Sequence, residues 1–452
     1  IDTLAYSFYQ VPPKNVKPRD NVEIRFCDDP GDVMHAAVHK NNIKGYEYLK
    51  EWAKITKHLR IWEYAVIYSP NLPTPTQLDL SADLNAYKKL GVEGIFYEQE
   101  NMLTTDMWDM KTWMEAKLME DPSADSDKLV KIYTDGYYGP AGKYIRKYLY
   151  LMHKALQEKP SFINFGGAPG GYNFINLKNV LESNALFDKA ESAVLNNQIL
   201  LDRVQFARTS LDRAICFRYR DLYREYEASG KTGELNISPQ ISGKRAAAIL
   251  RKMVKTRFAK DPKWGADAMN QVAILEGMSK MVLTAPLPEE LAKYPKNTVF
   301  DFSPDTFRLW GTFSTVEDHD AAYKSAVRLD IATRGADASK YIVTEASPMT
   351  IGHYNPKDRA FGKTAGITYK DIKPGYHLYK LGSIKMKPSE YFYIFWSWEI
   401  QVDMDKVMSD NPDQEYDIYA SVKFEGPSYP GGDKSKPDSI YVDRVLAVQL
   451  PK

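Results

Sequence analysis

The sequence predicts a multidomain chain in which an α/β part is followed by a helical region and then by an all-β part. In the first part, four short apolar runs alternate with loops and helical stretches. Further along, apolar residues recur at helical spacing, and after them come short alternating runs bounded by Pro, Gly, Asp and Asn. We therefore expect domains at residues 1–120, 121–290 and 291–452.

The α/β part has the pattern of half a (β/α)₈ barrel of the TIM type. Strands are predicted at residues 2–8, 21–27, 59–67 and 92–97, and the run at 59–67 is as apolar and aromatic as a buried parallel strand. Helices are predicted at 46–58 and 81–90, the second with Leu84 and Tyr87 on one face and Gly91 as its stop. A complete barrel uses about 30 residues for each of eight strand–helix units, so four strands make half of one.

The middle of the chain is predicted to be mostly helical between residues 128 and 260. Gly139 and Pro140 divide a helix at 128–138 from one at 140–157. A longer helix that ends near Gly230 carries an apolar stripe formed by Leu200, Val204, Ala207, Leu211 and Ile215. Such a stripe has to be buried, and we expect it to pack on the barrel beside its last strand.

The last part is predicted to be a two-layer antiparallel β-sandwich over residues 297–452. Its most apolar run, residues 391–402, reads YFYIFWSWEIQV and is apolar on both faces of a strand. We therefore expect one central strand there, covered on both sides. Sugar binding by the sandwich would require an exposed row of Trp or Tyr, whereas fully buried aromatic residues would form a core.

Composition argues against two classes of partner. A net charge of +1 argues against a nucleic-acid-binding protein, which needs a basic surface. The sequence has no run of about 18 apolar residues, so no membrane span is expected. The aromatic content of 13%, with 31 Tyr and 8 Trp, fits side chains that stack on sugar rings and equally fits large apolar cores.

Neither the cysteines nor the histidines indicate a bound metal or cofactor. Cys27 and Cys216 lie far apart without metal-ligand spacing, and two buried thiols are expected rather than a disulfide. His35 and His39 have the i, i+4 spacing of a zinc-binding helix, but no Glu follows His35 directly as the protease motif requires. We therefore expect no metal site and no cofactor.

Carboxylates and aromatic side chains gather at the ends of the last two predicted strands. These residues are Trp62, Glu63, Tyr64, Tyr97, Glu98 and Glu100. Sites in parallel α/β folds form at the carboxyl ends of strands. The same residues also fit a plainer interpretation, in which the acids belong to a charged loop and the aromatic rings fill the barrel.

Several separated motifs resemble one known family. They are WEY (62–64), PNLP (70–73), GVEGIFYEQE (91–100), WMEAKLMEDPSADSD (113–127) and DGYYGPAGKYIRKYL (135–149). In this order they resemble the bacterial glycoside hydrolases of the DUF4838 type, also called glycoside hydrolase family 163. The resemblance covers roughly the first 155 residues, and the C-terminal part matches only in its general pattern.

The resemblance implies a (β/α)₈ barrel with added helical and β-sandwich parts. It also implies endo-β-N-acetylglucosaminidase action, with an oligosaccharide or the N-glycan of a glycoprotein as partner. The location implied is secreted, periplasmic or cell-surface in Bacteroidetes-like bacteria. In such enzymes the 2-acetamido group of the substrate attacks the anomeric carbon, assisted by an adjacent acid and an orienting carboxylate.

The chain departs from the family pattern because its four strands correspond to the last four of the eight. In related barrels the acid and its neighbouring carboxylate end the fourth strand. They are therefore expected in a missing N-terminal barrel half, in the same or another polypeptide. We accordingly expect this chain to be inactive on its own.

Glu63 is the catalytic candidate, because many retaining barrels place the nucleophile at the end of the seventh strand. The family more often has Asp at this position, so a substrate-binding or structural carboxylate is an equal alternative. The candidates for substrate binding are Tyr6, Asp28, Trp62, Tyr64, Tyr97, Glu98 and Glu100, although Asp28 also fits a turn before Pro30. The alternative function is a non-catalytic glycan-binding protein with a degenerate barrel.

Overall fold

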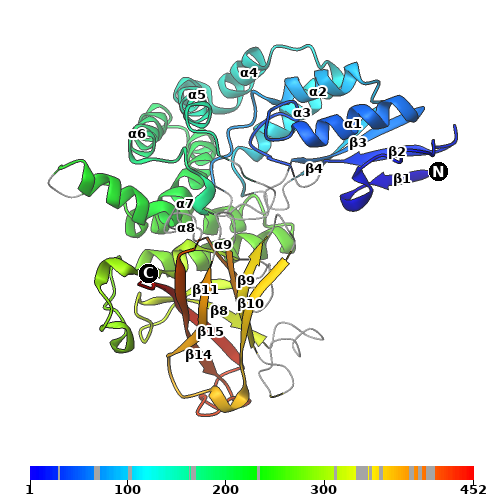
Figure 1. Ribbon diagram of the computed structural model, residues 1–452. Coiled ribbons are helices and arrows are strands. Elements are labelled where there is room, and N and C mark those ends of the chain that lie inside the picture. Colours follow the sequence, from blue (N-terminus) through cyan, green and yellow to red (C-terminus); the bar gives the residue numbers. More distant parts are fainter. Residues whose placement is uncertain are drawn as a thin grey trace. The chain divides into compact units, whose positions relative to one another are not determined.

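The structure is a computed structural model that describes residues 1–451 except 29–30, 66–71, 100–103, 162, 164–168, 232–234, 310–312, 332–344, 346–348, 356–359, 386–390, 395–399 and 404–412. The chain divides into two compact units (Figure 1). The first comprises Ile1–Ala214, Asp221–Thr232 and Asp261–Trp264, and the second comprises Ile215–Arg220, Gly233–Lys260 and Gly265–Lys452. The helices of the middle region belong partly to each unit, and the three predicted domains stay a prediction.

Four parallel strands form one sheet in the first unit, in the order of the chain. They are β1 (Asp2–Ala5), β2 (Glu23–Cys27), β3 (His58–Ala65) and β4 (Gly94–Gln99). The first strand ends at Ala5 rather than at residue 8, because Ser7–Gln10 forms a 3₁₀ turn. The four predicted strands are confirmed, while their membership of a barrel stays a prediction.

Three α-helices accompany these strands. They are α1 (Ile43–Ile55) between β2 and β3, α2 (Leu80–Lys89) between β3 and β4, and α3 (Trp108–Glu120) after β4. On one face of the sheet, Phe26 and Ile61 pack in one core with Trp52 of α1 and Tyr87 of α2. The opposite face carries charged side chains and the ring of Phe96, which is 47% exposed. Successive residues of a strand point to opposite faces, so each residue at a strand end points either to the helix-covered core or to the exposed face.

Four longer helices follow in the first unit, and α7 also contributes to the second. They are α4 (Ser126–Tyr138), α5 (Gly142–Glu158), α6 (Leu177–Ala193) and α7 (Gln198–Ala228). The break between α4 and α5 lies at Gly139, whose φ of 54° suits a residue without a β-carbon. The predicted apolar stripe of α7 is buried, with Val204 and Leu211 both at 0% exposure. The helical prediction for this region is therefore confirmed.

Two helices precede the strands of the second unit. They are α8 (Pro239–Lys255) and α9 (Pro262–Lys280). The Ser238 side chain accepts the N–H of Ile241 and so caps α8, whose first residue is a proline. A β-carbon at Gly243 would lie 2.8 Å from the carbonyl oxygen of Leu275, so this glycine permits α8 and α9 to approach closely. No helix in the described ranges is both long and apolar enough to cross a membrane.

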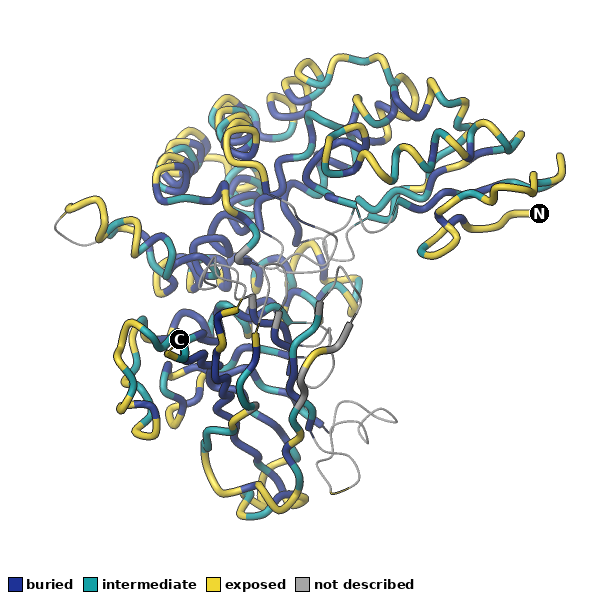
Figure 2. Tube along the Cα trace, viewed as in Figure 1, coloured by how far each residue is buried: buried dark blue, intermediate teal, exposed yellow. Residues whose placement is uncertain are grey.

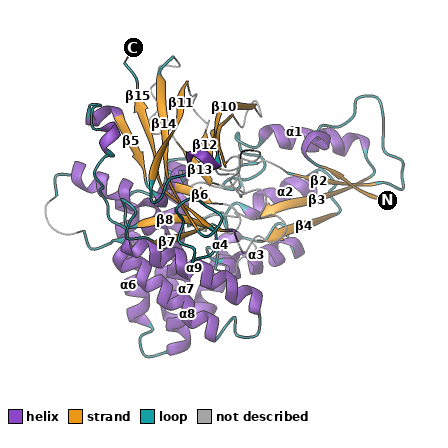
Figure 3. Ribbon diagram, turned by 90° about the horizontal axis from the view of Figure 1, so that it is seen from below, coloured by secondary structure: helices purple, strands orange, loops and turns teal. Residues whose placement is uncertain are grey.

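Two antiparallel sheets make up the rest of the second unit (Figure 3). One has the order β10-β9-β12-β13-β6, and the other has the order β11-β14-β15-β8-β7, with β5 paired to β15. The strands are β5 (Val299–Phe302), β6 (Phe307–Leu309), β7 (Ser314–Glu317), β8 (Ser325–Asp330), β9 (Met349–Asn355), β10 (Ala360–Ile367), β11 (His377–Lys385), β12 (Tyr391–Ile394), β13 (Ile400–Asp403), β14 (Glu415–Glu425) and β15 (Ser439–Gln449).

A shared apolar core joins the two sheets. It includes Phe392 and Val402 from one sheet and Ile418 and Val442 from the other. β14 and β15 are buried along most of their length (Figure 2). The prediction of a two-layer antiparallel sandwich is therefore confirmed.

The prediction of a single strand over residues 391–402 was wrong. β12 and β13 are two antiparallel strands paired with each other, with Tyr393 opposite Gln401. Both are interior strands of their sheet, so side chains of both faces are buried, as expected for a central position. A run that is apolar on both faces carries no clear periodicity to show that it forms two strands rather than one.

Candidate active site

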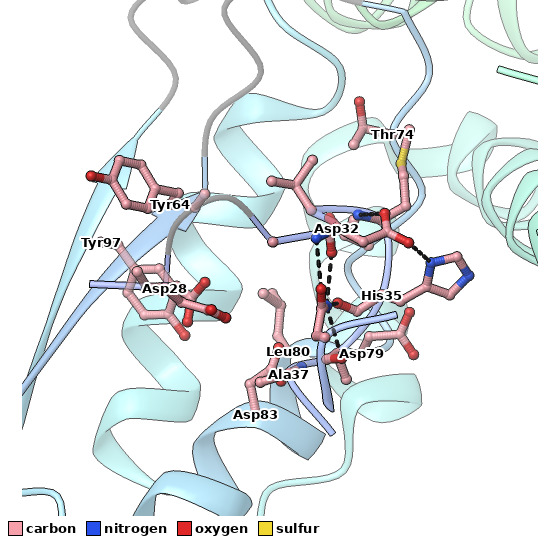
Figure 4. A pocket seen from close by; sticks show the side chains of 18 of the residues that line it. Asp28, Asp32, His35, Ala37, Tyr64, Thr74, Asp79, Leu80, Asp83 and Tyr97 are labelled. Atoms are coloured by element: carbon pink, nitrogen blue, oxygen red, sulfur yellow. Dashed lines mark hydrogen bonds and ion pairs between the residues drawn. The ribbon is translucent and has the colours of Figure 1, made fainter. Parts of the chain in front are cut away.

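The connections that follow β2, β3 and β4 meet at one edge of the parallel sheet. Because the strands share a direction, their carboxyl ends lie on this edge. Residues from the connections after β2 and β3, from the strand ends and from α2 and α3 line a cavity of about 70 Å³, which is room for several water molecules. Figure 4 shows the acidic side chains of this cavity, including Asp28, Asp79 and Asp83.

The connection after β2 is shaped by Asp32 and Asn42. The Asn42 side chain accepts the N–H of Asp32 and donates to the carbonyl oxygens of Asp32, His35 and Ala36. One oxygen of Asp32 accepts the N–H groups of Met34 and of the distant Ile163, each at 3.1 Å. These bonds satisfy buried backbone groups that no sheet or helix pairs, and they hold the loop against the cavity.

Glu63 lies near the carboxyl end of β3 and points to the helix-covered face. The Tyr87 hydroxyl of α2 donates a hydrogen bond of 2.5 Å to its Oε2. Burial raises the pKa of Glu63 to about 8, the negative charge of Asp28 contributes to this rise, and the Tyr87 bond opposes both effects. At neutral pH this side chain is therefore mainly protonated and can donate a proton.

Asp83 of α2 is a second buried carboxyl that interacts electrostatically with Glu63. Its carboxylate accepts the N–H of Ala37, yet burial and the charge of Glu63 hold its pKa well above the usual range. Burial alone also raises the pKa of Glu115 in α3 to about 7, against the effects of Gln99 and Lys111. Such shifts are expected where several carboxyl groups share a site with little solvent.

A pair of histidines lies on the same loop as Asp32. Nδ1 of His35 is 2.8 Å from Oδ2 of Asp32, and the rings of His35 and His39 stack at 4.1 Å with an angle of 13° between their planes. Residues 31–42 form turns rather than the helix that the i, i+4 spacing suggests. Burial lowers the pKa of His39, and the neighbouring His35 lowers it further. The carboxyl of Asp79 also has a raised pKa because of its burial.

Four of the residues selected from the sequence line this cavity. They are Asp28, Glu63, Tyr64 and Tyr97, although the ring of Tyr64 lies beside Trp62, with 6.5 Å between ring centres. Trp62 and Glu98 belong instead to the exposed face of the sheet, where the indole N–H of Trp62 donates to Oε2 of Glu98 at 2.9 Å. Tyr6 is 39% exposed at the end of β1, and Glu100 lies outside the described residues. The residues selected at the strand ends are thus divided between two faces of the sheet, and their functional roles stay predictions.

Several acidic side chains of the cavity were not predicted from the sequence. Asp79, Asp83 and Glu115 lie in or beside helices, where a charged residue is usually solvated. One signal was available for Asp83, because it lies four residues before Tyr87 and so shares its helix face. No local pattern marks Asp79 or Glu115.

Fold and site together define an α/β unit with an acidic cavity at the carboxyl edge of a parallel sheet, on a chain that continues into an antiparallel sandwich. Residues 1–150 match the family described as a domain of unknown function, DUF4838. This agrees with the resemblance found in the motifs, which lie in the same stretch. The search of curated proteins gave no match.

Among solved structures, one similar chain is titled as a GH138 enzyme targeting pectin rhamnogalacturonan II. It has 10% sequence identity and a TM-score of 0.31 to this chain, and the alignment covers 96% of this chain and 60% of that one. The chain thus spans 60% of the length of that enzyme.

Proposed function

We propose that this chain is part of a glycoside hydrolase that acts on N-acetylglucosamine-containing glycans, in the manner of an endo-β-N-acetylglucosaminidase on N-glycans outside the cell. The match of residues 1–150 to the DUF4838 family supports the family resemblance from which this proposal starts. The observation that carries the chemistry is Glu63, whose pKa is raised to about 8 by burial and by Asp28. A carboxyl that keeps its proton at neutral pH is what glycoside hydrolysis requires of its acid.

In the proposed reaction, the acetamido oxygen of the substrate attacks the anomeric carbon while the bond to the leaving oxygen breaks. A protonated carboxyl supplies the proton that the leaving oxygen takes up, and the resulting carboxylate later removes a proton from the attacking water. Glu63 can give such a proton and take it up again, because the negative charges of Asp28 and Asp83 favour the protonated form of its carboxyl. The acid and the neighbouring carboxylate expected on the missing fourth strand would take part in the same proton transfers.

The exposed face of the sheet supports the proposal that further strands complete a barrel. In a (β/α)₈ barrel the helices cover the outside, and the opposite strand face lines the interior. Here that face carries Trp62 and Glu98, and Leu4 and Phe96 on it are 48% and 47% exposed. Completion of the barrel would bury these apolar side chains and would place Trp62 and Glu98 on the interior face, near the carboxyl ends of the strands where sites form.

The test is the substitution Glu63→Gln in the natural full-length protein, with release of glycan from an N-glycoprotein as the assay. We expect turnover to fall by on the order of 10²-fold or more, because the amide cannot transfer the proton. Glu93→Gln is the matched control, since Glu93 contacts His58 at the start of β3, away from the cavity. Near-normal turnover by Glu63→Gln would make Glu63 a structural residue.

A second candidate function is glycan binding without hydrolysis. It is favoured by the aromatic residues on the exposed sheet face, where Trp62 lies 4.7 Å from Phe96 and 6.5 Å from Tyr64 between ring centres. Flat aromatic faces stack on sugar rings. Binding of the same glycan without any turnover, lost in Trp62→Ala and kept in Glu63→Gln, would favour this function over the enzyme.

A further inference from the structure

The loop after β2 carries a group of side chains that the proposed hydrolysis does not use. One possible ligand atom from each of Asp32, His35 and His39 lies within 4.8 Å of the other two. Two of the three residues are buried, and the two imidazole rings stack at 4.1 Å. Nitrogen and oxygen ligands gathered in the interior are the composition of a transition-metal site.

The hydrogen bonds of Asp32 decide which atom of His35 is available. Asp32 accepts the N–H groups of Met34 and Ile163 on one oxygen and contacts Asn41 and Nδ1 of His35 with the other. A carboxylate with these donors accepts the proton of Nδ1, which leaves the lone pair of His35 on Nε2. A carboxylate that orients the far nitrogen of a histidine is the usual arrangement behind a metal-binding imidazole.

Nε2 of His35 has no hydrogen-bond partner within the described part of the chain, although the side chain is only 3% exposed. A buried polar atom without a hydrogen-bond partner lowers the stability of the folded state unless a ligand binds it. The atom therefore points to a ligand, independently of the grouping of the three residues.

Asp79 supplies a second buried atom of this kind. It precedes α2, and its Oδ2 likewise has no partner among the residues that the structure describes. Its carboxyl interacts electrostatically with His35, His39 and also His153, whose Nδ1 lies 3.2 Å from the carbonyl oxygen of Pro75. Two connections that are distant in sequence thus direct buried, unsatisfied ligand atoms into one region (Figure 4).

We propose that His35 through Nε2, His39 and the carboxylate of Asp79 bind one divalent transition-metal ion of the zinc class, with Asp32 orienting His35. The charges balance, because the two carboxylates compensate the two positive charges of the ion and both imidazoles bind as neutral ligands. Calcium and magnesium fit less well, since they prefer shells made of oxygen atoms. Ligand atoms around tetrahedral zinc lie about 3.3 Å apart, so these side chains would have to close around the ion as it binds.

Such an ion would join the loop after β2 to the start of α2. Three protein ligands leave one position of a tetrahedral ion for water. The site is independent of the proposed hydrolysis, and its test needs no glycan.

The test uses the full chain without a histidine tag, freed of metal by chelation and dialysis. We expect calorimetric titration with Zn²⁺ to show one site per chain, and Co²⁺ to give the visible absorption of a tetrahedral complex. His39→Gln and Asp79→Asn should each raise the dissociation constant at least tenfold. These two variants are chosen because neither residue makes the loop hydrogen bonds of Asp32. Circular dichroism should confirm that both variants fold.

His319→Gln is the matched control, because His319 is 83% exposed in the second unit, beside Glu317. It should leave Zn²⁺ affinity unchanged. The proposal is overturned if Zn²⁺ shows no saturable binding, or if His39→Gln and Asp79→Asn bind it as tightly as the unmodified chain.

Discussion

Two glutamates of this sheet show how position decides the chemistry of one side chain. Glu63 lies near the end of β3 on the helix-covered face and holds its proton to about pH 8, while Glu98 on the neighbouring strand lies on the exposed face beside Trp62. The register pairs Glu63 with Tyr97 and Tyr64 with Glu98, so a shift of one residue exchanges the two faces. The buried position of Glu63 therefore gives its carboxyl the raised pKa that a proton donor needs.

The raised pKa of Glu63 predicts a loss of stability as pH rises. In the unfolded chain the carboxyl has the ordinary glutamate pKa of 4.5, whereas in the folded chain its pKa is about 8. The folded state thus binds the extra proton between these values, and the free energy of unfolding falls as pH rises through this window. We expect the melting temperature at pH 8 to lie a few °C below that at pH 5, as thermal unfolding followed by circular dichroism can measure.

Glu63→Gln should reduce this pH dependence and raise the melting temperature at pH 8, since the amide never ionises. Glu93→Gln is again the control, because Glu93 is 43% exposed at its side chain and should leave the dependence in place. An identical pH dependence in Glu63→Gln and the unmodified chain would contradict the assigned shift.

At the scale of elements, one amide organises the loop that forms a wall of the cavity. The Asn42 side chain pairs four buried backbone groups, and Asn42→Ala would leave them without these partners. We expect a loss of about 2–4 kcal/mol in the free energy of unfolding of the first unit, measured by urea titration.

Asn197→Ala is the comparison, because Asn197 only caps α7 through the N–H of Leu200 at an exposed position. Its cost should be near 1 kcal/mol. Equal costs for the two substitutions would show that Asn42 acts as an ordinary cap and not as the organiser of the loop.

A second element-scale prediction concerns the contact between α4 and α5. A β-carbon at Gly142 would lie closest to the carbonyl oxygen of Thr134, at a separation too short for two such atoms, so the two helices would have to move apart. We expect Gly142→Ala to destabilise the chain by about 1–3 kcal/mol in urea titrations.

Gly136 in α4 provides the matched control, since no heavy atom lies within 4 Å of the β-carbon built there. Gly136→Ala should stabilise the chain by about 0.5–1 kcal/mol through helix propensity. A destabilising effect at Gly136 or a neutral one at Gly142 would contradict this account of the helix contact.

At the scale of the whole molecule, the proposed half-barrel predicts that residues 1–452 are inactive alone. β1 has β2 as its only neighbour among the described strands, and the exposed sheet face carries Leu4 and Phe96. A barrel fills its interior with side chains from all eight strands, so four strands leave the substrate site incomplete. We expect no release of glycan from an N-glycoprotein by these residues and release by the full-length protein. Robust turnover by residues 1–452 as a monomer would end the half-barrel interpretation.

The sequence by itself determined the elements. Apolar spacing located the four strands, the helices between them and the buried stripe of α7, because burial of one face imposes a local period. Gly139 marked the helix break, and the short alternating runs after residue 297 marked the sandwich. The DUF4838 resemblance also came from the sequence alone, and the match over residues 1–150 agrees with it.

Only the tertiary structure decided which side chains meet. Strand register separated Glu63 from Trp62, and the packing of α2 brought Asp83 beside Glu63. Asp32 is held by a residue 131 positions away, so no local window could show how it orients His35. Periodicity records which residues are buried, whereas contacts between loops depend on how distant elements pack, and one sequence carries no local signal for that.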